Sequence, residues 1–203
     1  GYNGAAYLFY GPQTGTLSVT AADVTITGSS AGDYFGSPVS MPGDIDGDGT
    51  GDLIAVSGYT DHNSRSQSGS IYVFASPTSG GSDSVYHARL DGSAAGIYLQ
   101  EYDLGDFDGD SERDLVAGSR WDSTGGSMAG GAWLQYGPLA GTFDLAAADA
   151  IWTGDDASDW LGEDIAAIPD TNGDGFDELA FGASSVDNGS KNSVGNVYVW
   201  YRE

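Results

Sequence analysis

The chain has 203 residues and a formal net charge of -24, because 30 aspartates and glutamates stand against only six lysines and arginines. This excess of negative charge argues against binding of nucleic acid or of an anionic membrane surface. Cysteine is absent, which excludes disulfides and thiol chemistry, and no stretch is long and apolar enough to span a bilayer, so we expect no membrane insertion.

The expected elements are short β-strands, since glycine and aromatic residues are spread along the whole chain. The first two strands are expected at Ala5–Tyr10 and Val24–Thr27. A quartet of strands follows, at Tyr34–Ser40, Leu53–Ser57, Ser70–Phe74 and Tyr86–Leu90. Corresponding quartets are expected to begin near Ile97 and Trp160, and the last of these ends on its third strand, Asn196–Tyr201.

A repeat of about sixty residues organises these strands. Residues 10–52 align without a gap with residues 136–178, an offset of 126 positions that spans two repeats. The aligned identities include Gly11-Pro12 with Gly137-Pro138 and Gly15-Thr16 with Gly141-Thr142. Four short strands in a unit of this length are typical of one blade of a β-propeller.

The predicted fold is therefore all-β, built from propeller blades of four antiparallel strands in a single domain, 1–203. The repeats run approximately over 4–68, 69–130 and 131–194, and 195–203 starts a further repeat. About three blades' worth of strand forms an incomplete ring, because propellers close with roughly four to eight blades. Either the chain is part of a longer propeller, or copies assemble as a homo-oligomer that completes the ring.

Three acidic loops of one design lie between expected first and second strands, starting at residues 44, 106 and 170. Side-chain oxygens at the first, third, fifth and ninth positions can converge on one hard cation, and the seventh residue adds its backbone carbonyl. The predicted ligands are Asp44, Asp46, Asp48, Thr50, Asp52; Asp106, Asp108, Asp110, Glu112, Asp114; and Asp170, Asn172, Asp174, Phe176, Glu178, with Thr50, Glu112 and Phe176 binding through the carbonyl. We expect three Ca²⁺ sites.

Three other interpretations of these loops are less favoured. Asp-Gly clusters also form metal-free turns between strands, but three copies in one register, each with an oxygen-bearing side chain at all four positions, favour metal. An EF-hand loop begins alike but ends with a bidentate glutamate at position twelve, where this chain has Ala55, Ala117 and Phe181. Mg²⁺ is the alternative ion, but it requires stricter octahedral geometry, so calcium is favoured.

The Tyr34-Phe35-Gly36 segment, the repeated acidic loop and Gly182-Ala183-Ser184 resemble the FG-GAP repeats of integrin α-subunit β-propellers. The resemblance implies structure-stabilising calcium at the lower face, where the loops join the first and second strands of each blade. It also implies that partners bind at the upper face, formed by the loops between second and third strands. Four residues of these upper loops are candidates for a ligand face: Arg65, Arg120, Trp121 and Lys191.

An exposed arginine on a strongly acidic chain could bind an acidic peptide or a glycan, and Trp121 could serve as a stacking platform. The alternative is that these loops carry ordinary solvated residues. No catalytic group stands out, since neither His62 nor His87 has a spacing that ties it to a serine or a zinc ligand set. We therefore expect a protein that is not an enzyme. A glycosidase-type pair of carboxylates that are distant in the sequence but close in the fold stays an open alternative.

Calcium is abundant outside cells, so open loops of modest affinity suit a secreted or cell-surface protein. The function favoured by the sequence is an extracellular calcium-binding propeller module, integrin α-like, for adhesion or protein–protein interaction. The alternative is a carbohydrate-binding or accessory propeller of a secreted enzyme or lectin. A protein or glycan ligand on the upper face is expected in either case.

Overall fold

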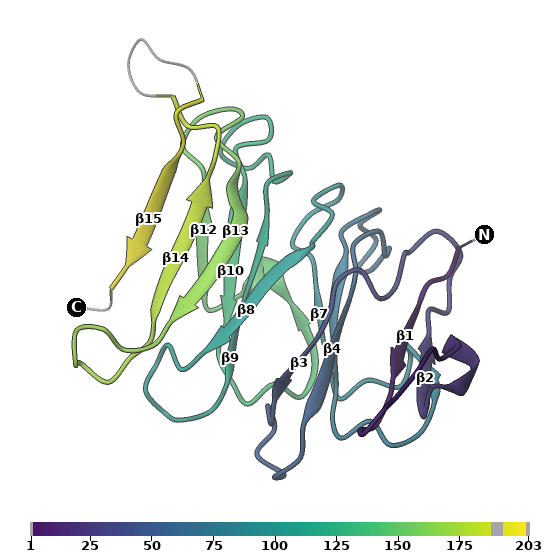
Figure 1. The fold of residues 1–203 in the computed structure, drawn as a ribbon. Helices are drawn as coiled ribbons and strands as arrows, with labels where there is room; N and C mark the ends of the chain where they lie inside the picture. The colour runs from purple at the N-terminus through teal and green to yellow at the C-terminus, as the bar shows by residue number, and fades with distance from the viewer. Residues whose placement is uncertain (1, 188–192, 202–203) are drawn as a thin grey trace.

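The computed structural model describes residues 2–187 and 193–201. These residues form an all-β structure with two single-turn 3-10 helices, as the sequence predicts (Figure 1). The elements are, in order, β1 Ala5–Leu8, η1 Val19–Ala21, β2 Val24–Thr27, β3 Val39–Gly43, β4 Asp52–Ser57, β5 Ser70–Phe74, β6 Gly81–Ser82, β7 Ala88–Asp91, β8 Glu101–Gly105, β9 Asp114–Ser119, β10 Gly131–Gln135, β11 Gly141–Asp144, η2 Leu145–Ala147, β12 Ala150–Thr153, β13 Leu161–Ile168, β14 Glu178–Ala183 and β15 Asn196–Trp200. None of the helices in these ranges is long and apolar enough to cross a membrane.

The strands form four sheets that stand side by side like incomplete propeller blades, and none closes into a barrel (Figure 1). Apart from one short strand each at the edge of the first and second sheets, β6 and β11, the first sheet holds β1 and β2, the second β3-β4-β5-β7, the third β8-β9-β10-β12 and the last β13-β14-β15. All pairs within these groups are antiparallel. The expected sequence of two strands, two quartets and a final group of three is confirmed.

The hydrophobic cores lie between neighbouring sheets, which explains why the central strands are apolar along their whole length. In β4, Ile54 and Val56 contribute to one core, whereas Leu53 and Ala55 contribute to the core on the opposite side of the sheet. This division follows from the alternation of side chains along a strand. Each blade therefore depends on both neighbours for its burial, as expected of a repeat architecture.

The first strand of each blade begins later than predicted, and the expected strand Tyr34–Ser40 is wrong in its first half. The strand β3 starts at Val39, because Tyr34 and Gly36 have φ angles of 57° and 91° and the chain turns there. Trp160 repeats the left-handed conformation of Tyr34 with a φ angle of 62°, and Tyr98 repeats that of Gly36 with a φ angle of 49°. Accordingly, β8 begins at Glu101 rather than near Ile97, while β13 begins at Leu161, close to the expected Trp160.

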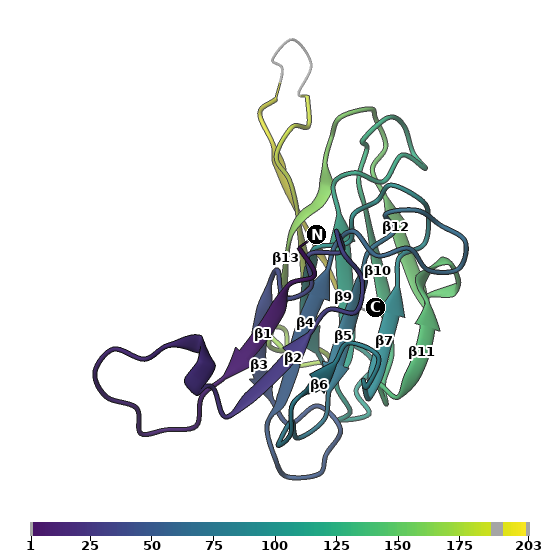
Figure 2. The same cartoon turned by 90° about the vertical axis from the view of Figure 1, so that its right-hand side faces the viewer.

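Two short strands that the sequence did not predict join successive sheets. Each lies in the linker between the third and fourth strands of its own blade and pairs in parallel with the fourth strand of the preceding blade. Thus β6 pairs with β2, and β11 pairs with β7 in the register Gly141 to Ala88 through Asp144 to Asp91 (Figure 2). These parallel pairs add backbone hydrogen bonds to the apolar packing between sheets.

Candidate metal centres and the opposite face

The three acidic loops occupy the same place in successive blades. They join β3 to β4, β8 to β9 and β13 to β14, and all three lie at one end of the sheets, at the bottom of Figure 1. The loops between β4 and β5 and between β9 and β10 lie at the opposite end. Strands of equal direction in each blade produce this arrangement, so the repeated sequence gives a repeated position in space.

In the first loop, the carboxylates of Asp44, Asp46 and Asp48 offer oxygen atoms that lie within 4.8 Å of one another. Backbone amides fix the orientation of Asp44, since its Oδ1 accepts from Gly47 N at 2.8 Å and its Oδ2 from Gly49 N at 2.8 Å. The backbone therefore curls around the first carboxylate. A donor set made only of hard oxygens at this spacing fits Ca²⁺ rather than a softer metal.

Asp52, the ninth residue of the first loop, is fully buried and lies outside this cluster of three. Its Oδ2 accepts a hydrogen bond from Ile45 N at 2.8 Å, and its Oδ1 accepts one from Ser76 N at 2.8 Å. Asp114 has the same arrangement in the second loop, with Phe107 N at 2.7 Å and Gly137 N at 2.8 Å. The ninth carboxylate thus ties its loop to the linker that follows the third strand.

In the second loop the converging carboxylates are Asp106, Asp108 and Asp114, and in the third they are Asp170, Asp174 and Glu178. In both loops the first aspartate accepts backbone amides from the fourth and sixth residues: Gly109 at 2.7 Å and Ser111 at 3.0 Å for Asp106, and Gly173 at 2.6 Å and Gly175 at 3.0 Å for Asp170. The curl of the backbone is thus common to all three loops.

The remaining predicted ligands are Asp110, Asn172 and the seventh residue of each loop. Asp110 Oδ1 accepts from Glu112 N at 2.8 Å, and Asn172 Oδ1 accepts from Asp174 N at 2.8 Å. Thr50 N and Phe176 N donate in the same way to the fifth residue of their loops, Asp48 and Asp174, at 2.8 and 3.0 Å. The amide of the seventh residue therefore has one orientation in all three copies.

The local electrostatics differ among the loops. Burial raises the pKa of Asp114 to about 6, against the opposing effect of the hydrogen bonds from Gly137 N and Phe107 N. By contrast, hydrogen bonds from Gly173 N and Gly175 N lower the pKa of Asp170, and those from Ser76 and Thr50 lower the pKa of Asp48. A bound cation would favour the ionised form of every one of these carboxylates.

Asp177 joins the second and third loops, a connection that the sequence did not reveal. Its Oδ2 accepts from Asp106 N at 3.0 Å and its Oδ1 from Asp170 N at 3.2 Å, so one carboxylate holds the first residue of both loops. Asp177 N in turn donates to Asp106 O at 2.9 Å. The two candidate sites are therefore linked directly through backbone and side chain.

The candidate ligand residues of the upper loops are engaged in contacts within the chain. Arg65 makes two hydrogen bonds to Asp144, at 2.6 and 3.0 Å, and a third to Gly92 O at 3.1 Å. It therefore holds the end of β11 against the second blade. Lys191 lies outside the residues that the structure describes.

Arg120 and Trp121 lie together, as their adjacent positions in a loop require. The guanidinium of Arg120 contacts the Trp121 ring, 4.7 Å from its centroid, and the Trp160 ring at 5.3 Å, and it donates to Glu163 Oε1 at 2.6 Å. The hydrogen bond from Ser184, and then the one from Arg120, lower the pKa of Glu163. Arg120 thus bridges the third and last blades while Trp121 remains exposed.

An aromatic row extends from Trp121 across the upper face. Ring centroids lie 5.0 Å apart between Tyr34 and Tyr59, 5.1 Å between Tyr59 and Tyr98, and 6.1 Å between Tyr98 and Trp121. Tyr34, Tyr59 and Trp121 are exposed. The row was not predicted because Tyr34 and Tyr98 lie in segments expected to be strands, and the two tyrosines occupy different positions of the repeat.

Comparison with protein families matches residues 161–200 to the FG-GAP repeat. The matched range covers β13, β14 and β15, together with the third acidic loop. The predicted resemblance to FG-GAP, propeller-like proteins is thereby confirmed for the last repeat. Comparison with curated proteins gives no match to the chain.

Proposed function

We propose that the chain is a noncatalytic, extracellular propeller module that is stabilised by three calcium ions and binds a protein partner, as in adhesion, through its upper face. The observation that carries the calcium assignment is that each of the three equivalent loops brings three carboxylates together, with the first aspartate of the loop common to all three clusters. Clustered carboxylates repel one another unless a cation lies between them. When bound, calcium would supply that positive charge and cross-link the first and second strands of each blade.

The loop residues divide into two roles in this proposal. Asp44, Asp106 and Asp170 hold the ion, and each is oriented by the amides of its own loop. Asp52 and Asp114 position the loop against the linker that follows through hydrogen bonds that do not require metal, and Asp114 also belongs to the converging carboxylates of its own loop. The extracellular assignment rests on the match to the FG-GAP repeat and on the high extracellular concentration of calcium.

Calorimetry tests the metal assignment. We expect Ca²⁺ to raise the melting temperature above that in chelator, Mg²⁺ to do so poorly, and titration to give three sites per chain. The double variant Asp44→Asn, Asp46→Asn should lose one site, whereas Asp156→Asn, a matched change of an exposed aspartate outside the loops, should lose none. A melting temperature that chelator leaves unchanged would contradict calcium binding.

The aromatic row supports the upper face as the binding face, because exposed tyrosine and tryptophan are enriched at interaction sites. Tyr34, Tyr59 and Trp121 supply exposed rings there, and Arg120 adds a cation beside Trp121. Immobilised protein can be screened against extracellular matrix proteins with wild type and Trp121→Ala, using Val85→Ala on another exposed segment as the control. Loss of a captured partner in the Trp121 variant alone supports the assignment.

The same exposed rings favour carbohydrate binding as a second candidate function, since aromatic rings are also platforms for sugars. A glycan array separates the two candidates. Glycan binding that needs Trp121 would favour the lectin-like or accessory role. Binding only to protein surfaces would favour the adhesion-like role.

A further inference from the structure

Residues 10–23 of the linker between β1 and β2 are a copy of residues 136–149, the linker between β10 and β12, at the offset of 126 residues. The two copies fold alike: η1 occupies Val19–Ala21 where η2 occupies Leu145–Ala147. Tyr10 N donates to Asp23 Oδ2 at 2.7 Å, just as Tyr136 N donates to Asp149 Oδ2 at 2.9 Å. We call them the N-terminal linker and the docked linker.

The docked linker is bound to the preceding blade. Its strand β11 pairs with β7, and Leu139 and Leu145 are buried in the core between the second and third blades. Arg65 of the second blade closes the contact through its two hydrogen bonds to Asp144. The docked linker is therefore an inter-blade connection made of one parallel strand and two buried leucines.

The N-terminal linker keeps apolar residues at Leu17 and Val19, although Gln13 stands where Leu139 is and Ser18 where Asp144 is, and no blade of the described residues lies before it. Leu17, the counterpart of Phe143, is 45% exposed, and Val19, the counterpart of the fully buried Leu145, is 53% exposed. Figure 2 shows this linker standing away from the sheets beside β1 and β2. Two apolar side chains are thus presented to solvent by a segment whose copy buries them.

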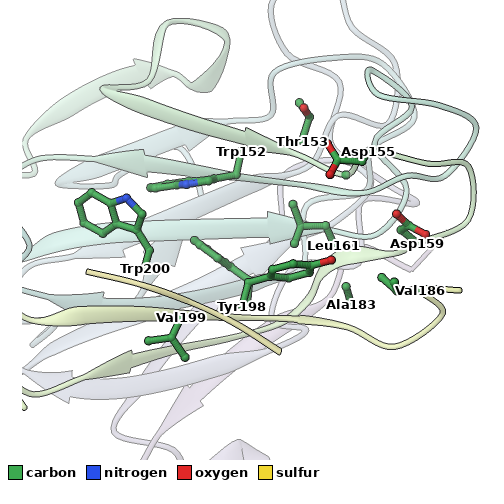
Figure 3. Close-up of a pocket in the computed structure, with 12 residues that line it drawn as sticks. Trp152, Thr153, Asp155, Asp159, Leu161, Ala183, Val186, Tyr198, Val199 and Trp200 are labelled. Atoms are coloured by element: carbon green, nitrogen blue, oxygen red, sulfur yellow. The ribbon is translucent and has the colours of Figure 1, made fainter. Parts of the chain in front are cut away.

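The opposite end of the molecule presents the surface that such a linker would cover. Strand β12, the counterpart of β7, has only β10 as a neighbour in the described chain, and β15 has only β14. A pocket of about 230 Å³ lies between them, lined by Trp152, Leu161, Phe181, Tyr198 and Trp200 (Figure 3). Tyr198 is 43% exposed, whereas its counterpart in the third blade, Trp133, is 2% exposed under the docked linker.

We propose that residues 11–27 of one copy of this chain complete the last blade of a second copy. Residues 15–18 add in parallel to β12, with Gly15 opposite Ala150 and Ser18 opposite Thr153, the register in which β11 pairs with β7. Leu17 and Val19 enter the pocket beside Trp152. Strand β2 then separates from β1 of its own copy and pairs with β15 of the second copy. This replacement is possible because β1 and β15 are equivalent third strands.

Reciprocal exchange gives a closed assembly. Each of the two copies contributes the four-stranded sheets β3-β4-β5-β7 and β8-β9-β10-β12. Each β13-β14-β15 sheet gains β2 of the other copy as its fourth strand. The total is six four-stranded blades, within the roughly four to eight with which propellers close. Exchange of equivalent elements between copies is a known route to dimers. The proposal is independent of calcium binding and of the partner of the upper face.

The mass in solution, measured by light scattering across a concentration series, is the first test. Wild type should form a dimer of 20.9 kDa chains, and Leu17→Asp, Val19→Asp should halve the measured mass. These two side chains are exposed in the single chain, so the variant should keep its circular dichroism spectrum. Val85→Asp, which alters a more exposed apolar residue elsewhere, should leave the dimer intact. A wild type that is monomeric up to its solubility limit would overturn the proposal.

Cysteine cross-linking tests the register, since the chain has no cysteine of its own. Thr16 would lie opposite Ile151 of the second copy, and both are exposed in the single chain. Mixing Thr16→Cys with Ile151→Cys under oxidising conditions should give a disulfide-linked dimer. The control mixture, Thr16→Cys with Val85→Cys, should not. Equal cross-linking in both mixtures would contradict this register and overturn the proposal.

Discussion

Arg65 holds Asp144 from a different blade, through paired hydrogen bonds of 2.6 and 3.0 Å. The two residues are 79 positions apart in the chain. Their contact closes the docked linker over the second blade and gives this arginine a structural role. The same contact has a measurable pH dependence.

Asp144→Asn should lower the free energy of unfolding by about 1 kcal/mol at neutral pH, the upper end for partly exposed ion pairs. Arg65 is the main cause that lowers the pKa of Asp144 in the folded protein. The ion pair therefore stabilises the fold above the ordinary aspartate pKa, and this contribution is lost as the pH falls through the lowered value. Asparagine still accepts from Ala146 N, so the cap of η2 is kept. Urea unfolding at neutral and strongly acidic pH should show a difference from wild type only at the former.

Asp52→Asn should destabilise the chain by about 2 kcal/mol whether calcium is present or chelated, because a buried acceptor of two backbone amides is replaced by a group with one acceptor oxygen. Both oxygens of Asp52 accept such amides, from Ile45 and Ser76. Asp44→Asn, by comparison, should cost stability mainly when calcium is present. Thermal unfolding of both variants with calcium and with chelator gives the comparison. A loss at Asp52 that vanishes in chelator would contradict its positioning role.

Ser111→Gly should stabilise the second acidic loop by about 1 kcal/mol, since a residue with a side chain pays this much for a left-handed conformation. Ser111 has φ of 72°, at the position that Gly49 and Gly175 occupy with φ of 88° and 91°. The reverse change, Gly49→Ser, should cost a similar amount in the first loop, where a Cβ would meet no atom within 4 Å. Melting temperatures of the two variants should move in opposite directions.

Asp177→Ala should weaken calcium binding at both the second and the third loops while leaving the first unchanged. Its carboxylate holds the amides that begin the second and third loops, Asp106 N and Asp170 N. Calcium titration calorimetry resolves the effect, with Asp156→Ala as the matched control. Weakening confined to the third loop would contradict the link between the two sites.

The sequence predicted the grouping of the antiparallel blade strands because the repeat places an apolar run after each acidic loop, as at Leu53 and Leu115. It also predicted that the three loops share one end of the sheets. It did not predict β6 and β11, since pairing of Gly141 with Ala88 is a contact between distant segments with no pattern of its own. The contact of Arg65 with Asp144 was not predicted for the same reason. Tyr34 was assigned to a strand because aromatic residues favour strands, but its φ of 57° places it in a turn.

The parallel strands β6 and β11 both reach backward along the chain, never forward. Loss of any blade therefore exposes the core that it shares with each neighbour, and it also removes the parallel strand that pairs with the fourth strand of the blade before it. Unfolding of one blade should consequently destabilise the preceding blade more than the following one. Limited proteolysis should therefore release the blades from the C-terminal side toward the N-terminus. The direction in which the molecule comes apart is thus set by β6 and β11, strands that are only two and four residues long.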